Sequence, residues 1–188
     1  MEVNTVLKTI LFLVASAGIV YVSRASLRAP RSHGFCRFFA WEAILALILV
    51  NLDHWFRDPF SLQQVLSWIF LIVSAILVVH AVHLLAIIGK PDAQRSDEEA
   101  TIGIEKTTHL VSVGAYKYIR HPMYSSLLFL AWGVFLKDFS WLSGVLALAA
   151  TAFLVATAKV EEAEDIHFFG TSYQTYTKQT KMFVPFLF

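Results

Sequence analysis

The chain has 188 residues, of which 57% are hydrophobic and 15% are charged, and its formal net charge is +1. Soluble domains usually carry about 25% charged residues, so the composition excludes an ordinary soluble protein and indicates lipid as the solvent. The single cysteine, Cys36, excludes an internal disulfide and a thiolate metal cluster. The length is that of one domain, residues 1–188.

Five apolar segments predict an all-α integral membrane bundle. The first is near the lower length limit for a spanning helix, and the fourth is short. Lys137-Asp138 forms a polar tip between the last two segments, which therefore read as a helical hairpin. The predicted spans are residues 5–22, 35–52, 66–88, 123–136 and 139–158, followed by a helical tail, 159–188.

Proline and glycine mark two helix boundaries after the third span. Pro122 suits the first turn of a helix and pushes His121 out of helical geometry. Gly170 is expected to end the fifth helix. Thr171-Ser172 then caps a last short helix that carries Tyr173 and Tyr176 on one face.

Glu42, His80 and His83 are titratable residues well inside the predicted spans. Glu42 is interpreted as a partly hydrated residue near the start of its helix, with a role in the site as the alternative. His80 and His83, three residues apart, share a helix face. Metal binding would need a third ligand, so hydrogen bonding inside the bundle is the favoured interpretation.

The basic residues are distributed unevenly. Segments 23–37, 89–122 and the tail hold 12 of the 15 Lys and Arg residues. This bias predicts an N-terminus outside and a cytoplasmic face that carries the 89–107 loop and the tail. The basic residues follow the membrane face, so they do not indicate nucleic-acid binding.

A polar stretch, residues 109–124, runs from this loop into the fourth span. Its arginine, histidine and tyrosines are costly beside lipid unless they are paired or solvated, which makes a functional site the default hypothesis. Glu161-Glu162 falls on the same predicted face, which favours one shared site. Whether the 89–107 loop, with its acidic centre 97–99, acts as a lid is left open.

The polar residues also carry a family pattern. Leu110-Val111, Gly114, Tyr116, Arg120-His121-Pro122 and Tyr124 form LV-x-x-G-x-Y-x-x-x-R-H-P-x-Y, and Glu161-Glu162 follows after one helical hairpin. Residues 108–188 resemble the isoprenylcysteine carboxyl methyltransferases, of which phospholipid N-methyltransferases are distant relatives. The first three spans are similar only as hydrophobic segments.

The resemblance implies S-adenosyl-L-methionine as methyl donor, bound in a cytoplasmic pocket that the 89–122 loop and the C-terminal tail form. It also implies a lipophilic small molecule or lipid as acceptor, entering from the bilayer. Arg120 or His121 would pair with the cofactor carboxylate, and Glu162 or His121 would take a proton from an amine acceptor. No metal is implied, and the oligomeric state is open. The implied cofactor-binding residues are Thr108, His109, Leu110, Val111, Gly114, Tyr116, His121, Pro122, Met123, Tyr124 and Glu161, and the implied catalytic residues are Arg120 and Glu162.

Two positions depart from the family pattern. Thr108 stands where many relatives have histidine, and His109 follows one place later. Thr157 stands where the carboxyl methyltransferases have an arginine for the acceptor carboxylate. Lys159, two residues on, is rotated by about 200° on a helix. The acceptor therefore stays open among a carboxylate, an amine and a thiol.

Two alternatives belong to other functional classes. A small transporter or channel-like bundle would use Glu42, His80 and His83 along a polar path, and internal repeats would favour it, but the sequence shows none. A noncatalytic membrane scaffold of the same fold would be favoured by loss of Arg120-His121-Pro122 or of the glutamate pair, but both are present.

Overall fold

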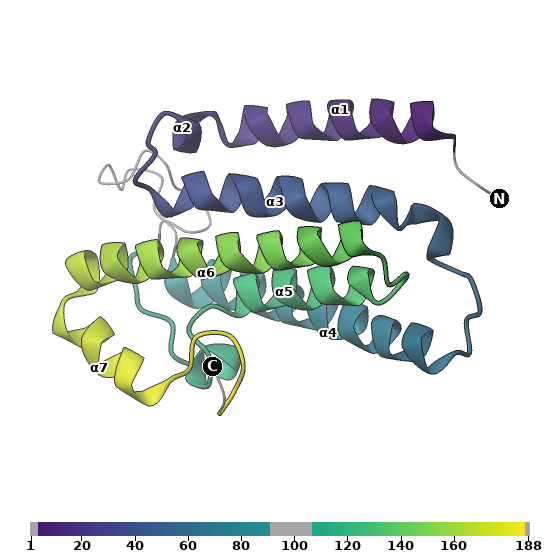
Figure 1. Ribbon diagram of the computed structural model, residues 1–188. Helices are drawn as coiled ribbons and strands as arrows, with labels where there is room; N and C mark the ends of the chain where they lie inside the picture. The colour runs from purple at the N-terminus through teal and green to yellow at the C-terminus, as the bar shows by residue number, and fades with distance from the viewer. Residues whose placement is uncertain (1–3, 91–106, 187–188) are drawn as a thin grey trace.

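The computed structural model describes residues 4–90 and 107–186, and within these residues the fold is all-α (Figure 1). The acidic centre of the 89–107 loop lies outside the described residues. The elements are α1 (Thr5–Val22), α2 (Arg24–Leu27), α3 (His33–Val50), the 3-10 turn η1 (Leu52–His54), α4 (Leu62–Leu84), its π-helical continuation η2 (Leu85–Gly89), the 3-10 turn η4 (Gly114–Lys117), α5 (Pro122–Phe135), α6 (Trp141–Phe169) and α7 (Thr171–Gln179).

The bundle has two ends, which Figure 1 places on the left and on the right. We call the end with α2, α7 and the last turns of α6 the pocket end. We call the other end, with the turn between α5 and α6, the hairpin end. The long helices run between these two ends.

Four helices among the described residues are long and apolar enough to cross a membrane: α1, α3, α4 with η2, and α6. They indicate a multi-pass membrane protein. The fourth predicted span is the helix α5, whose 14 residues extend about 21 Å, less than the ~30 Å hydrocarbon core of a bilayer.

Polar caps explain where the helices depart from the predicted boundaries. Helix α4 begins at Leu62 rather than residue 66, because the Ser61 hydroxyl accepts a hydrogen bond from the backbone N–H of Gln64. Helix α6 begins at Trp141 rather than residue 139, and Ser140 caps it through the N–H of Ser143. Helix α3 begins at His33 rather than residue 35.

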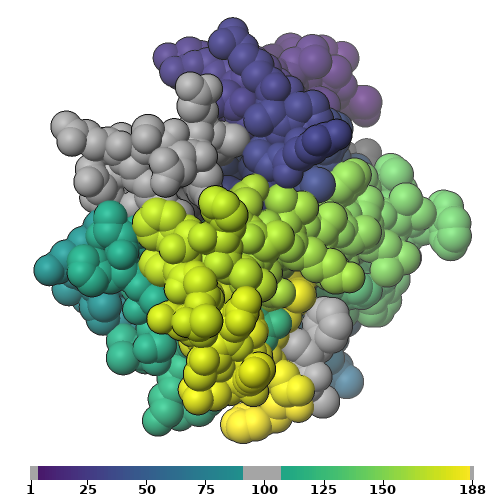
Figure 2. All heavy atoms as spheres, turned by 90° about the vertical axis from the view of Figure 1, so that its left-hand side faces the viewer, coloured from purple at the N-terminus to yellow at the C-terminus, as the bar shows by residue number. Residues whose placement is uncertain are grey.

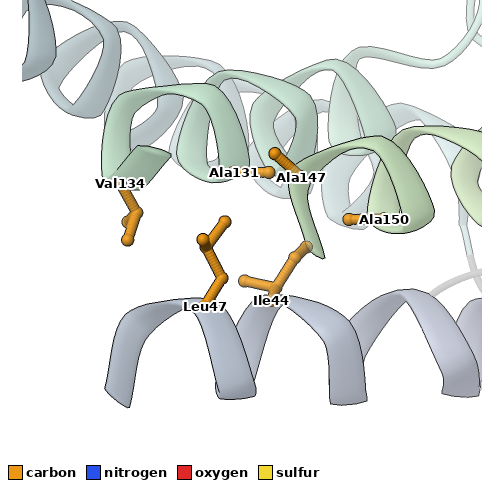
Figure 3. Packing of buried hydrophobic residues seen from close by; sticks show 6 residues of the cluster. All are labelled: Ile44, Leu47, Ala131, Val134, Ala147 and Ala150. Carbon is orange, nitrogen blue, oxygen red and sulfur yellow. The ribbon is translucent and has the colours of Figure 1, made fainter. Parts of the chain in front are cut away.

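Small residues let the helices approach closely. Helix α3 packs mainly on α6, and α4 packs mainly on α5. The hydroxyls of Ser67 and Ser74 on α4 each donate to a backbone carbonyl of α5 at 2.7 Å. Figure 3 shows the apolar core where α3, α5 and α6 meet, made of Ile44, Leu47, Ala131, Val134, Ala147 and Ala150.

Glu42 lies in the middle of α3, so its predicted place near a helix start is wrong. Because α3 begins at His33, the helix dipole at its start does not explain this carboxylate. The hydroxyl of Ser16 on α1 donates to Glu42 Oε1 at 2.9 Å. Glu42 therefore joins α1 to α3.

Lys137, at the predicted polar tip, is buried at the hairpin end with 3% exposure. Its ammonium group donates to Gln64 Oε1 at 3.0 Å and lies 3.9 Å from the centroid of the Trp68 ring. The Trp55 ring lies 5.5 Å away. Cation–π contacts and a neutral amide thus replace solvent around this charge.

Candidate active site

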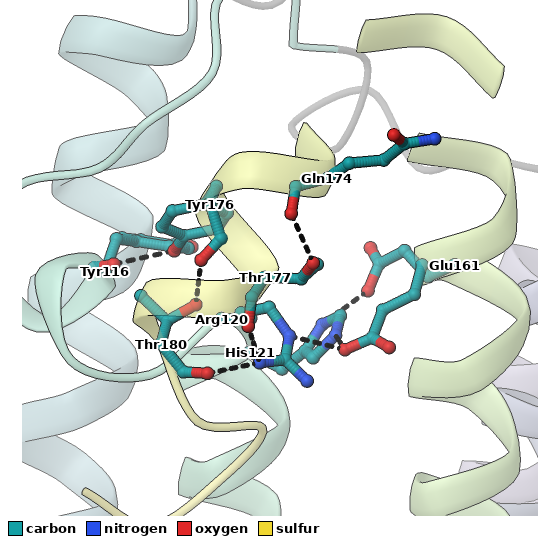
Figure 4. A network of polar contacts seen from close by, with 9 residues as sticks. Tyr116, Arg120, His121, Glu161, Gln174, Tyr176, Thr177 and Thr180 are labelled. Atoms are coloured by element: carbon teal, nitrogen blue, oxygen red, sulfur yellow. Dashed lines mark hydrogen bonds and ion pairs between the residues drawn. The ribbon is translucent and has the colours of Figure 1, made fainter. Parts of the chain in front are cut away.

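The junction between the polar stretch and α5 has the predicted geometry. Pro122 is the first residue of α5, and His121 precedes it with φ −120° and ψ 62°, outside the helical region. The His121 side chain is 4% exposed and lies between α7 and α6, as Figure 4 shows. The proline thus directs a buried imidazole toward the carboxylates of another helix.

His121 contacts both glutamates of the predicted pair. Its Nδ1 lies 2.9 Å from Glu161 Oε2, and its Nε2 lies 3.3 Å from Glu162 Oε1. Both ring nitrogens can donate to carboxylates only when the ring is an imidazolium. Burial favours the neutral ring, but the hydrogen bonds and charges of the two glutamates outweigh it and raise the pKa of His121 to about 9. The cluster therefore holds a cation at neutral pH.

Arg120 joins this cluster to α7. Its Nε donates to Glu162 Oε1 at 2.6 Å, and its Nη1 donates to the carbonyls of Thr177 at 3.3 Å and Thr180 at 2.5 Å. Carbonyls at a helix C-terminus lack intrahelical partners. The guanidinium supplies one, so Arg120 fixes the end of α7 against the glutamate pair (Figure 4).

Helix α7 covers the site with two tyrosines. Tyr173 and Tyr176 are both buried, on one helix face as predicted. The Tyr176 hydroxyl donates to the Tyr116 carbonyl at 2.6 Å. Burial raises the pKa of both phenols, so both are neutral.

The predicted Thr171-Ser172 cap is wrong. Thr171 is the first residue of α7, and Gly170, with φ 61°, is its N-cap without a side-chain hydrogen bond. Gly170 also ends α6, as predicted. One left-handed glycine therefore forms the whole corner between the two helices.

Glu164 attaches the same part of α6 to α3. Its Oε1 accepts from the backbone N–H of His33 at 3.2 Å, and its Oε2 pairs with the His33 ring Nδ1. Ser32, the N-cap of α3, makes no side-chain cap bond. The carboxylate of Glu164 therefore caps α3 from a distant helix.

These elements surround a partly open pocket with a cavity volume of about 80 Å³. This volume is smaller than the about 300–1,000 Å³ of most ligand pockets. In Figure 2, which views the pocket end, the last turns of α6 and the helix α7 lie over the centre of the surface. Of the predicted site residues, the pocket wall contains Leu110, Val111, Tyr116, Arg120, His121, Met123, Tyr124 and Glu161.

The wall also contains residues that the sequence analysis missed. Asp165 lies one turn after Glu161 on α6, and Tyr173 and Tyr176 come from α7. Helical periodicity from Glu161 could have found Asp165. Leu85, Thr107 and Phe169 complete the wall.

The other predicted residues are not part of this wall. The Thr108 hydroxyl donates to the Lys90 carbonyl at 3.0 Å and lies 2.9 Å from His109 Nδ1, and both side chains are exposed. Glu162 binds Arg120 and His121. Gly114 and Pro122 contribute backbone geometry. Cofactor contacts for these residues stay predictions.

One of the two positions that depart from the family pattern is Thr157, with Lys159 two residues further on. The buried Thr157 hydroxyl donates to the Phe153 carbonyl of its own helix at 2.7 Å, and Lys159 is exposed.

Among the described residues, no three His, Cys, Asp or Glu side chains form a group that could hold a metal ion. His80 and His83 are therefore not part of such a group, and both are exposed, so the interpretation that both rings are hydrogen-bonded inside the bundle is wrong.

The described helices form an apolar bundle of the membrane type, with a buried ion-pair cluster beside a pocket at one end. Residues 62–172, more than half of the chain, match the family model for phospholipid methyltransferases. The chain belongs to this family of membrane methyltransferases, which confirms the resemblance found in the sequence.

Curated relatives are methanethiol S-methyltransferases. The chain is 33% identical over 72 residues to one from Pseudomonas deceptionensis, covering 38% of the chain and 27% of the relative. It is 36% identical over 73 residues to a second from Bradyrhizobium diazoefficiens, covering 39% and 27%. It is 26% identical over 152 residues to one from Crocosphaera subtropica, covering 80% and 55%. The chain thus matches between a quarter and about half of these relatives' lengths, and no solved structure matches it.

Proposed function

We propose that this protein transfers a methyl group from S-adenosyl-L-methionine to a lipophilic acceptor that reaches the pocket from the bilayer. One observation carries the proposal. The family-pattern residues from the stretch before α5 and Glu161 from α6 meet at a single pocket beside the His121 cation. Membership of a methyltransferase family supports the reaction class.

The pocket walls fit the chemistry of the cofactor. Leu110, Val111 and Met123 offer an apolar surface for an adenine ring. Glu161 and Asp165 offer carboxylates for an ammonium group or ribose hydroxyls, and Arg120 offers a cation for a carboxylate. When bound, the cofactor supplies an electrophilic methyl group on a positive sulfur atom.

In this proposal, His121 prevents a free carboxylate from stabilising the positive sulfur of the cofactor before the reaction. A bare carboxylate near a sulfonium would stabilise the ground state more than the transition state, in which the positive charge is lost. His121 balances Glu161 and Glu162 with its own charge and fixes their direction. The chain's contribution to catalysis is then alignment of the two reactants, which can be worth ~7–11 kcal/mol.

A second pocket suits an apolar acceptor. It has a cavity volume of about 250 Å³ and lies among Phe70 of α4, Leu128 and Trp132 of α5, Val155 of α6, and Phe183. The Phe183 ring centroid lies 6.1 Å from that of His121, which lines the first pocket. The hydrocarbon part of an acceptor would occupy this space.

The names of the relatives and of the family support a choice of reacting atom. The relatives are named for a thiol, and the family for phospholipids. We propose a lipophilic thiol as the first acceptor class: its S–H proton leaves to water, and the thiolate then takes the methyl group without a general base. An amine would have to lose a proton, and Glu162 or His121 would accept it.

The proposed topology has five spans, with α5 as a short fourth one. The N-terminus lies outside, and the pocket end and the C-terminus face the cytoplasm, which follows the predicted bias of basic residues. The acceptor then approaches from the bilayer, and the cofactor enters from the water at the pocket end.

The experiment that tests the cofactor is calorimetric titration of the detergent-solubilised protein with S-adenosylhomocysteine. We expect saturable micromolar binding that Glu161→Gln weakens by at least about tenfold, while Asp58→Asn, a change of an exposed acid between η1 and α4, retains it within about threefold. A folded, monodisperse protein without binding would contradict the proposal and favour a noncatalytic scaffold.

The acceptor is tested by transfer of radiolabelled methyl groups. Alkanethiols of increasing chain length and phosphatidylethanolamine vesicles are offered side by side. Thiol turnover that rises with chain length supports the proposed acceptor class. Turnover of the phospholipid alone would assign an amine instead.

A further inference from the structure

His80 of α4 contacts the backbone of the turn η4. The N–H of Ala115 donates to His80 Nε2 at 3.2 Å. The first N–H groups of a helical turn lack partners in their own helix, so this side chain satisfies one of them. An accepting Nε2 requires a neutral ring with its proton on Nδ1.

Gly114 allows this close contact. Its φ is +60°, and a Cβ at this position would lie 2.5 Å from His80 Nε2 and 2.7 Å from Leu84 Cδ1. Any other residue would displace the imidazole and strain the backbone. The glycine of the family pattern thus serves the packing of η4 on α4.

A second attachment lies at the end of the same helix. The Gly89 carbonyl accepts from the N–H groups of Thr108 at 2.9 Å and His109 at 3.2 Å. A Cβ on Gly89 would lie 2.6 Å from Thr107 Cγ2. Gly89 closes the π-helical segment η2, and such segments often occur at functional sites.

Between these two attachments the chain enters the pocket wall. Val111 and Tyr116 pack against Ala81, Leu84 and Leu85 of α4 and η2. Tyr116 is 7% exposed, and its carbonyl accepts the Tyr176 hydroxyl of α7. The turn η4 is therefore held by α4 on one side and by α7 on the other.

We propose that His80 is a positioning residue for the cofactor pocket: as a neutral hydrogen-bond acceptor it fixes η4 on α4 and so places Tyr116. This inference rests on the proposed function for the identity of the ligand. It assigns a role to a histidine outside the family pattern and inside a membrane-crossing helix, where a polar side chain is costly unless paired.

His83 provides a matched control. It lies one turn further along α4 and is also exposed. It makes no hydrogen bond to a residue that the structure describes in the η4 turn. Glutamine at position 80 provides the rescue, because its side-chain oxygen reaches about as far as imidazole Nε2 and accepts a hydrogen bond.

The test compares His80→Leu, His80→Gln and His83→Leu in the full chain. One readout is amide hydrogen exchange of a peptide that contains Ala115, and the other is affinity for S-adenosylhomocysteine. For His80→Leu we expect faster exchange at Ala115 and about three- to tenfold weaker binding, the effect of one lost hydrogen bond. We expect His80→Gln and His83→Leu to behave as wild type in both.

Three results would overturn the inference. The first is unchanged exchange in His80→Leu. The second is faster exchange with unchanged affinity, which would leave His80 a purely structural role. The third is a glutamine variant that behaves like leucine. If the wild type does not bind S-adenosylhomocysteine, the proposed function fails, and the exchange readout still decides whether His80 holds the turn.

Discussion

The pocket end and the hairpin end both bury a cation, but they compensate its charge differently. At the pocket end, His121 lies between Glu161 and Glu162 and lines open space. At the hairpin end, Lys137 lies against the Trp68 face and the Gln64 amide. Burial lowers the pKa of Lys137, whereas the two carboxylates raise that of His121.

This contrast indicates that the cation at the pocket end belongs to a binding site and that the cation at the hairpin end serves packing. Carboxylates paired with His121 keep further lone pairs that can accept a ligand's ammonium or hydroxyl groups. The aromatic faces around Lys137 are filled by the lysine itself. We therefore expect substitutions at the pocket end to change both ligand affinity and stability, and substitutions at the hairpin end to change stability alone.

The largest effect is expected for His121→Ala. It leaves Glu161 and Glu162 without their shared cation in a mostly buried site. We expect the free energy of unfolding to fall by about 2–4 kcal/mol and S-adenosylhomocysteine to bind at least about tenfold weaker. Thermal unfolding in detergent and calorimetry measure the two effects, with His83→Ala as control. Wild-type values in both would break the comparison.

The interaction of charged His121 with the two glutamates can also be tested by a pH titration, which needs no ligand. The folded pKa of His121, about 9, lies above the unfolded value of 6.5. The stabilisation is therefore complete below about pH 6.5 and is lost as the pH rises through about 9, with a total of about 3 kcal/mol. The measurement is the difference in melting temperature between wild type and His121→Asn from pH 6 to 10. A constant difference would contradict a charged His121.

A smaller effect is expected for Tyr176→Phe. The substitution removes the hydrogen bond to the Tyr116 carbonyl and keeps the ring. We expect a loss of about 1 kcal/mol in stability and several-fold weaker binding of S-adenosylhomocysteine. Tyr118→Phe, an exposed tyrosine of the same stretch, is the control in both measurements. Equal effects of the two substitutions would remove the role of α7 in holding η4.

The smallest effect is expected for Lys137→Met. Methionine keeps the length of the side chain and packs well on tryptophan faces, while the cost of burying a charge disappears. We expect stability to change by no more than about 1 kcal/mol and ligand affinity to stay the same. A loss of affinity would show that the hairpin end influences the pocket.

The sequence predicted the features that depend on local rules. Pro122 and Gly170 mark the boundaries that the structure shows, because each imposes a backbone geometry. The stretch before α5 and Glu161 meet at one pocket because their polarity is costly beside lipid.

Apart from this shared site, the sequence could not predict which individual residues far apart in the chain contact one another. Lys137 reads as a surface charge because Gln64 and Trp68 lie far away in the chain. The predicted start of α4 at residue 66 is too late, because the first turn of the helix contains glutamines that a hydropathy pattern excludes. The orientation of α6 in the bundle decides that Glu161 faces the pocket while Glu164 caps α3.

Because Glu164 bonds to the start of α3, the part of the chain that matches the family model depends on a helix outside the match. The match begins at residue 62, after α3, and ends at residue 172, before Tyr173 and Tyr176. Glu164 nevertheless fixes the α6 turns that carry Glu161 by capping a helix outside the match. A graft of residues 62–172 into another membrane scaffold would lose this cap and both tyrosines. Exchange of the less similar N-terminal helices between relatives would have to preserve a partner for Glu164.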